Sequence, residues 1–243
     1  MTIPSSITSL GTSCFEYCSN ITSVTIPSSV ISLGNECFAS CSELSSIEIS
    51  PSVISLGDWC FYNCSKLTAI NIPSSVTSLG NHCFENCSGI TSITIPTSVT
   101  SLGIFCFFGC SGISSIVIPS SVTTFFYYFF GYCSQLTSII IPSSVTSLGD
   151  GCFVHCDELA SISCYATTSP ECVQITFDGF NPSLCKLYVP QESIDKYKVA
   201  DGWKSFSNIY ALGGSGESDQ ISSTSSPNIV ASCNNGIITI SGL

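Results

Sequence analysis

The chain has 243 residues, of which 44% are apolar and only 9% are charged. This composition excludes a charge-rich disordered chain, because enough apolar surface is present to bury a core. Five Lys against sixteen Asp and Glu give a net charge of −11. Residues 1–161 contain a single cation, Lys66, so nucleic acid is excluded as a partner, since phosphate neutralisation requires clustered cations. No apolar run reaches the roughly 18 residues that a transmembrane segment needs.

A regular period, the spacing from Phe15 to Phe38, runs through residues 1–161. Phe recurs in seven consecutive units, and two columns of Cys share the period, with Phe129 standing in one Cys position. A single unit cannot bury its own apolar face, so the pattern predicts seven stacked units. The Phe column is Phe15, Phe38, Phe61, Phe84, Phe107, Phe130 and Phe153. The Cys columns are Cys14, Cys37, Cys60, Cys83, Cys106 and Cys152, and Cys18, Cys41, Cys64, Cys87, Cys110, Cys133 and Cys156.

Each unit contains a segment with the spacing of a leucine-rich repeat strand. In one copy Ile90, Ile93 and Ile95 occupy the first, fourth and sixth places, and Pro96 follows. Alternate side chains of such a strand enter the core and the others face outward. Because Pro cannot donate a hydrogen bond to a ladder, it ends the strand. The strand is therefore predicted to be short in every unit.

The segment after the proline is expected to form the outer side of the unit. Gly80 marks a turn that favours a residue without a side chain, and Phe126 at the same place should distort that turn if φ is positive there. Cys83, Phe84 and Cys87 then occupy positions i, i+1 and i+4. This spacing predicts a short helix or a tight turn.

The sequence Ile-Pro-Ser-Ser-Val-Thr-Ser-Leu-Gly at 72–80 and at 141–149, followed by Cys-Phe-x-x-Cys-Ser, resembles the BspA-like leucine-rich repeat family. The resemblance covers residues 1–161, although the family usually carries Ala in the first Cys column. It implies an α/β repeat fold, a leucine-rich repeat solenoid of seven 23-residue units with a C-terminal cap. It also implies an extracellular or cell-surface location and binding of host proteins or other cells.

Four regions are expected along the chain. Residues 1–161 form the repeat array and 162–212 the cap, in which we expect a strand at 186–189, a stop at Pro190 and a helix from about Ser193 to Tyr197. Residues 213–228 have the composition of a flexible linker, and 229–243 read as the start of a truncated β module. The chain starts within a repeat and without a signal peptide, so we expect it to be a fragment.

The cysteines allow three interpretations. Zinc is disfavoured because a site needs four ligands and only His82 and His155 could complement the thiolates. Disulfides within units would leave Cys133 without a partner, although bonds between adjacent units are geometrically possible. Buried thiols acting as small apolar groups fit the repetition best. The pairing of Cys164, Cys172, Cys185 and Cys233 stays open.

No nucleophile and base, or acid and base, stand together, so we expect no enzyme activity and no cofactor or metal. A row of aromatic residues, each one period from the next, is the candidate ligand-binding patch. It either packs between outer turns, half-buried, or forms an exposed surface that binds a protein or glycan. With its flanking residues, this patch comprises Trp59, Tyr62, His82, Phe105, Phe108, Tyr127, Tyr128 and Tyr132.

These patterns predict a non-enzymatic interaction protein, secreted or at the cell surface, that serves in adhesion or in binding host proteins or other cells. A structural spacer that carries another surface module is the alternative. The outward strand positions, such as Thr22, Thr25, Thr91 and Thr94, form a neutral hydroxyl-bearing face. Ice binding by this face is a remote alternative, which freezing-point hysteresis would reveal.

Overall fold

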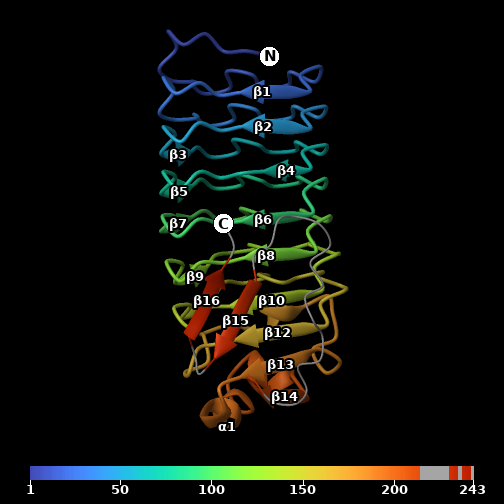
Figure 1. The fold of residues 1–243 in the computed structure, drawn as a ribbon. Helices are drawn as coiled ribbons and strands as arrows, with labels where there is room; N and C mark the ends of the chain where they lie inside the picture. The colour runs from blue at the N-terminus through green and yellow to red at the C-terminus, as the bar shows by residue number, and fades with distance from the viewer. Residues whose placement is uncertain (214–229, 235–236, 242–243) are drawn as a thin grey trace. The chain divides into compact units, whose positions relative to one another are not determined.

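The computed structural model describes residues 1–213, 230–234 and 237–241. These fall into two units, residues 1–212 and 213–243. The first unit is a parallel β-solenoid of about eight coils, with α1 (Ile194–Tyr197) at the end away from the N-terminus (Figure 1). Strand partners such as Ser23 with Ser46 and Ser92 with Ser115 are one sequence period apart. The predicted leucine-rich repeat solenoid is thereby confirmed.

The first ladder is built from the Ile- and Val-containing segments that precede the prolines. In β1, β2, β6 and β8 the central side chain is buried and its neighbours are exposed, as strand alternation requires. The ladder has three sections, β1-β2-β4, β6-β8 and β10-β12-β13-β14. Its strands in the repeats are β1 (Ser23–Thr25), β2 (Ser46–Glu48), β4 (Ala69–Ile70), β6 (Ser92–Thr94), β8 (Ser115–Val117), β10 (Ser138–Ile141) and β12 (Ser161–Cys164).

The second ladder comes from the Ser-Leu-Gly segment of each repeat. Here the coils approach so closely that only Gly fits after the Leu: a Cβ on Gly80 would lie 2.5 Å from the backbone carbon of Gly57. Gly80 does not have a positive φ, so lack of space rather than backbone conformation selects Gly. The ladder has two sections, β3-β5-β7 and β9-β11. The strands are β3 (Ser55–Leu56), β5 (Ser78–Leu79), β7 (Ser101–Leu102), β9 (Thr124–Phe125) and β11 (Ser147–Leu148).

The outer side of each repeat is a series of turns and not a helix. Backbone N–H groups alternate between two acceptors: His82 and Phe84 donate to Ile104 and Cys106 of the next coil, at 2.8 and 2.9 Å, whereas Glu85 donates within its own turn. In an α-helix each of these N–H groups would donate to a carbonyl oxygen four residues earlier in the same segment. Of the predicted helix or tight turn, the repeats contain the turn, and the solenoid has little helix.

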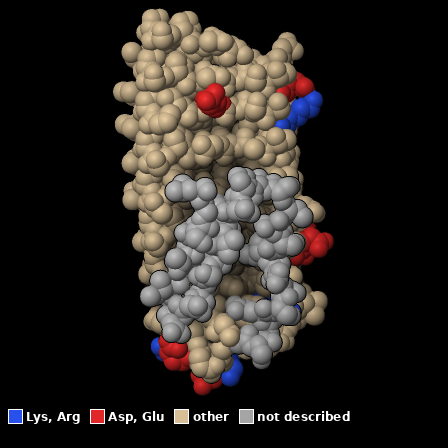
Figure 2. Space-filling model, in the orientation of Figure 1, with Lys and Arg blue, Asp and Glu red and all other residues tan. Residues whose placement is uncertain are grey.

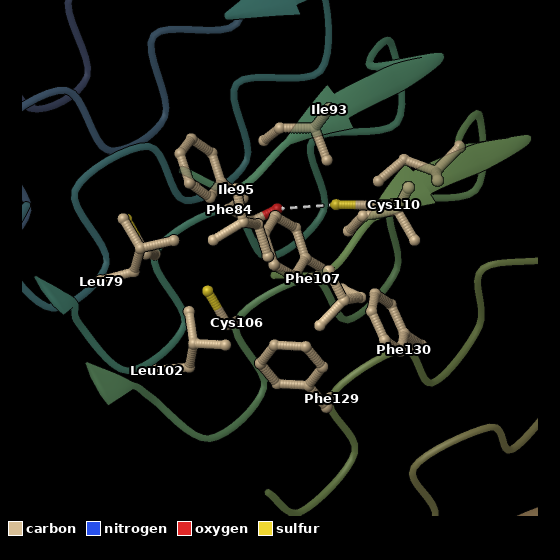
Figure 3. Packing of buried hydrophobic residues seen from close by; sticks show 14 of the residues in the cluster. Leu79, Phe84, Ile93, Ile95, Leu102, Cys106, Phe107, Cys110, Phe129 and Phe130 are labelled. Carbon is tan, nitrogen blue, oxygen red and sulfur yellow. Dashed lines mark hydrogen bonds between the residues drawn. The ribbon is translucent and has the colours of Figure 1, made fainter. Parts of the chain in front are cut away.

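The core consists of the Phe column and the two Cys columns. Phe84 and Phe107 stack with ring centroids 5.5 Å apart, and the thiol of Cys110 donates to the carbonyl oxygen of Phe84 at 3.0 Å (Figure 3). Leu and Ile side chains from the two ladders close the core on either side. The Phe rings are fully buried from Phe38 onward, and Phe15 is partly buried.

The sixth coil departs from this plan because it carries larger side chains. Phe125 and Phe129 stand where other coils have Leu and Cys, and both rings are fully buried beside Phe130. Phe126 replaces the Gly of the close approach, and in the described solenoid β9 does not pair with β7. The φ of Phe126 is not positive, so the turn distortion expected for a positive φ does not arise there.

The parallel stacking continues beyond residue 161, although the sequence period does not. β12 pairs with β13 (Lys186–Val189) and β13 with β14 (Asn208–Ala211), and the spacing of their partners departs from that of the repeats. Phe177 adds an eighth ring to the Phe column, 5.9 Å from Phe153. The expected strand at 186–189 and the short helix ending at Tyr197 are both present. The boundary at residue 161 stays a prediction.

Aromatic side chains close the far end of the core. Trp203 is fully buried, packs edge-on against Phe177 at 5.1 Å and donates from Nε1 to the carbonyl oxygen of Pro170 at 2.8 Å. Tyr197 is also buried and donates to the carbonyl oxygen of Ala166. Besides α1, this region contains the short 3-10 helices η1 (Gln174–Phe177), η2 (Gln191–Ser193) and η3 (Trp203–Ser205).

In the second unit, β15 (Val230–Asn234) pairs antiparallel with β16 (Ile237–Ser241). Residues 235–236 and almost all of the predicted linker at 213–228 lie outside the described residues. No helix in the described part of the chain is both long and apolar enough to cross a membrane.

Candidate functional site

The candidate patch is built on one continuous stack of rings. Trp59, His82, Phe105 and Tyr128 occupy the same position in four successive coils. Their ring centroids are 4.7, 4.8 and 5.0 Å apart, and the rings are within 8° of parallel. This spacing equals the separation of neighbouring β-strands, so the solenoid itself sets the stacking distance. We call these four residues the aromatic row.

The backbone beneath the aromatic row is left-handed. All four residues have φ between 52° and 57°. Such a conformation costs an L-residue about 1–2 kcal/mol and is rare for bulky side chains. The turn geometry imposes it on every coil, since Glu36 and Gly151 in the same column also have positive φ.

The other predicted patch residues surround the row. Phe108 packs edge-on against Phe105 at 5.3 Å and lies 5.2 Å from Tyr132. Gly131 leaves the space for this ring, because a Cβ there would lie 2.9 Å from Phe108 Cδ2. Tyr127 is exposed next to the row, and Tyr62 is half-buried near Trp59 in the same coil. The structure thus brings six of the eight into one continuous surface of rings. Tyr62 lines a pocket with Trp59, and Tyr127 lies beside the row.

Exposure differs along this surface. Tyr127, Tyr132 and Trp59 are 53%, 46% and 36% exposed, whereas His82, Phe105 and Tyr128 are half-buried. The rings therefore pack on one another and still present their edges to solvent. His82 Nδ1 contacts Glu85 Oε2, which fixes the imidazole in the stack. Charged side chains are sparse on the solenoid as a whole, and Figure 2 shows one face on which most of the described surface is uncharged.

Three residues near the row were missed by sequence reasoning. Glu16, Tyr17 and Glu36 line a pocket of about 210 Å³ together with Trp59 and Tyr62. Tyr17 is 72% exposed. The sequence contained only one indication of these residues, namely that two of them share a repeat position with a patch residue. Glu36 stands one period before Trp59, and Tyr17 stands five periods before Tyr132.

Most of the repeat cysteines are not positioned for surface chemistry. Eleven of the thirteen are buried free thiols, while Cys18 is partly buried and Cys14 exposed. Burial raises the pKa of Cys37 to about 12. A reactive cysteine needs a lowered pKa and access to solvent, so these thiols act as core groups. Within the described residues no three His, Cys, Asp or Glu side chains form a group that could hold a metal ion.

The outward face of the first ladder offers a second exposed surface. Its residues are mostly Ser and Thr, as predicted, and Val117 and Ile140 are 60% and 47% exposed there. The interruptions of this ladder between β4 and β6 and between β8 and β10 divide the face into short sections.

Comparison with known protein families shows to which family the chain belongs. The family described as BspA type leucine rich repeat region matches residues 1–103 and 55–181, in six copies. The chain belongs to this family. BspA-type membership suggests a binding or surface role, and such repeat proteins are typically non-enzymatic.

Solved structures of leucine-rich repeat proteins share the fold of this BspA-type chain. A leucine-rich repeat protein of T. pallidum is 26% identical, with a TM-score of 0.61, and the match covers 65% of this chain and 77% of that one. A leucine-rich repeat protein from Bacteroides ovatus is 24% identical, with a TM-score of 0.57, over 87% and 68% of the two chains. No curated protein sequence matches the chain.

Proposed function

We propose that this BspA-type chain is a non-enzymatic binding protein of the cell surface or the extracellular space, and that the candidate patch holds a protein or glycan ligand. One observation carries the proposal: the aromatic row is stacked in register over four coils and keeps its ring edges in solvent. Aromatic anchors of this kind dominate protein interfaces and also stack on other flat or apolar ligand surfaces.

The backbone supports the same proposal. Left-handed backbone occurs at two positions in each of the seven repeats. Ser13, Tyr17, Glu36, Ser40 and His155 adopt it at a cost, whereas Asn63, Asn86, Gly109 and Gly151 tolerate it well. Rings at Trp59 and its stacked neighbours instead add a backbone cost of about 1–2 kcal/mol each. Strained conformations that persist tend to gather at functional sites. Stacking of the rings offsets part of this backbone cost. Contact with a ligand would explain why aromatic residues occupy these positions.

The first prediction concerns the triple variant Trp59→Asn, Phe105→Asn and Tyr128→Asn. Asn suits the left-handed backbone, so the variant should fold while losing the ring surface. We expect retention on an array of immobilised glycans and matrix proteins to fall at least about tenfold, which corresponds to about 1.4 kcal/mol. Circular dichroism and the urea midpoint check that the solenoid is intact.

The matched control changes the other exposed face, with Val117→Thr and Ile140→Thr. This variant should bind as the unchanged protein does. If the control loses binding and the triple variant keeps it, the ligand uses the strand face and the proposal is wrong. If the unchanged protein binds nothing on the array or to intact cells, the structural-spacer alternative is favoured.

A further inference from the structure

One end of the aromatic row is closed and the other opens into a pocket. At the closed end the ring of Tyr128 lies over Gly151, where a Cβ would be 2.6 Å from Tyr128 Cε1. At the other end Trp59 stacks on His82 with one face only, and the preceding coil carries Glu36, not a ring, in the same column. The pocket of about 210 Å³ lies at this end, lined by Glu16, Tyr17, Glu36, Ala39, Ser40, Trp59 and Tyr62.

Two carboxylates share this pocket with three aromatic rings. Glu36 accepts a hydrogen bond from Ser13 Oγ at 2.9 Å, which orients one carboxylate. Among the described residues neither Glu16 nor Glu36 forms an ion pair. Two other glutamates have a basic partner: Glu43 pairs with Lys66, and Glu85 contacts His82. The negative charge of this pocket is therefore available to a cation from outside the chain.

We propose that the pocket binds the guanidinium group of an arginine side chain on a partner protein. A guanidinium is planar, so it can stack on an aromatic face and donate paired hydrogen bonds to a carboxylate at once. Rings beside a cation add attraction through their negative faces. The net charge of −11, with Lys66 as the single cation of residues 1–161, draws a basic partner toward this surface.

This inference rests on the proposed function in part, since Trp59 and Tyr62 belong to both surfaces, and it names the chemistry of the partner. The partner presents an exposed arginine that reaches the pocket, while its remaining surface covers the ring edges of Phe105 and Tyr128. An arginine at this point would fix the register of the partner along the row, because the pocket is at one end only.

Intrinsic fluorescence gives a direct test on the full chain. Trp59 lines the pocket, whereas Trp203, the other tryptophan, is fully buried at the far end of the core. We expect the peptide acetyl-Gly-Arg-Gly-amide to change Trp59 emission in a saturable way. The peptide with citrulline in place of arginine, which is similar in shape but uncharged, should bind at least about tenfold more weakly. The peptide with lysine, which keeps the charge but lacks the planar group, should also bind more weakly.

A charge-matched pair of variants locates the effect. Glu16→Gln with Glu36→Gln should weaken the arginine peptide at least about tenfold, and Glu158→Gln with Glu192→Gln, which removes the same charge from exposed positions elsewhere, should not. Equal binding of arginine and citrulline peptides, equal binding of arginine and lysine peptides, or equal affinity of both variants would overturn the inference. Loss of array binding in the triple variant, without an arginine effect, would leave the proposed function standing and remove this inference alone.

Discussion

At the scale of single residues, the high cysteine content is explained by the repeat, because most of the repeat cysteines are small core residues. From Cys41 onward, each thiol of the complete column donates to a Phe carbonyl oxygen one coil back, at 3.0 to 3.3 Å. That oxygen also accepts a backbone N–H within its own turn, as Phe61 does from Cys64. Cys thus fills the volume of a small apolar residue and supplies a weak additional hydrogen bond.

Burial of the repeat thiols in both columns predicts a loss of stability at alkaline pH. The pKa of Cys60 and that of Cys83 are raised well above 9.0, because burial disfavours the thiolate. The unfolded chain therefore releases these protons first, and the stabilising contribution is complete below about pH 9 and declines above it. Each buried thiol should lower the free energy of unfolding by about 1.4 kcal/mol per pH unit in that range.

Urea unfolding at pH 8.0, 8.5, 9.0 and 9.5 measures this effect, because the eleven buried repeat thiols together leave little stability at higher pH. The variant Cys60→Ala with Cys83→Ala should start less stable at pH 8 but decline less steeply, by up to about 3 kcal/mol per pH unit, than the unchanged protein. Ionisation of Tyr and Lys is common to both proteins and cancels in the comparison. Parallel slopes for the two proteins would mean that these thiols are not buried in the folded chain.

At the scale of elements, the close approach of coils at the Gly column limits what the second ladder accepts. A Cβ on Gly103 would lie 2.3 Å from the backbone nitrogen of Asn81, and no flexible side chain can yield there. Phe126 is the natural exception, and the ladder is interrupted between β7 and β9 where it stands. The outer turns still connect these coils, as Phe107 donates to Phe129 at 3.1 Å.

A single methyl group tests this constraint. We expect Gly103→Ala to lower the free energy of unfolding by about 1–3 kcal/mol, because the coils must separate to admit the Cβ. Gly11→Ala is the matched control from the same column, since no atom lies within 4 Å of its Cβ position. That change should be neutral or slightly stabilising, through the lower entropy of the unfolded chain. The prediction fails if both variants unfold at the same urea concentration.

At the scale of the whole molecule, the sequence predicts most of what repeats and misses what does not. The first ladder, the Phe column and the aromatic row could be placed because each recurs once per period. The second ladder was not predicted, because its strands are only two residues long. The eighth coil was not recognised, since Phe177 stands one position later than the period requires after Phe153 and no Cys accompanies it. Turn and helix were indistinguishable by spacing alone, because the deciding hydrogen bonds connect different coils.

The candidate site shows the same division. Rings one period apart must meet in a solenoid, so the aromatic row followed from the sequence. The pocket at its end did not, because Glu16, Tyr17 and Glu36 are single residues in three columns. Their proximity depends on the direction in which each side chain projects from its turn. Tyr17 and Glu36 have a left-handed backbone, which no sequence motif predicts.

Hydroxyl-radical footprinting with a captured ligand bound tests the central claim, that the aromatic row is the binding surface, most directly. Oxidation of Trp59, Phe105 and Tyr128 should fall when the ligand binds, while oxidation of exposed Tyr165 and Tyr210 should not change. Protection of Val117 and Ile140 with no change along the row would contradict the account.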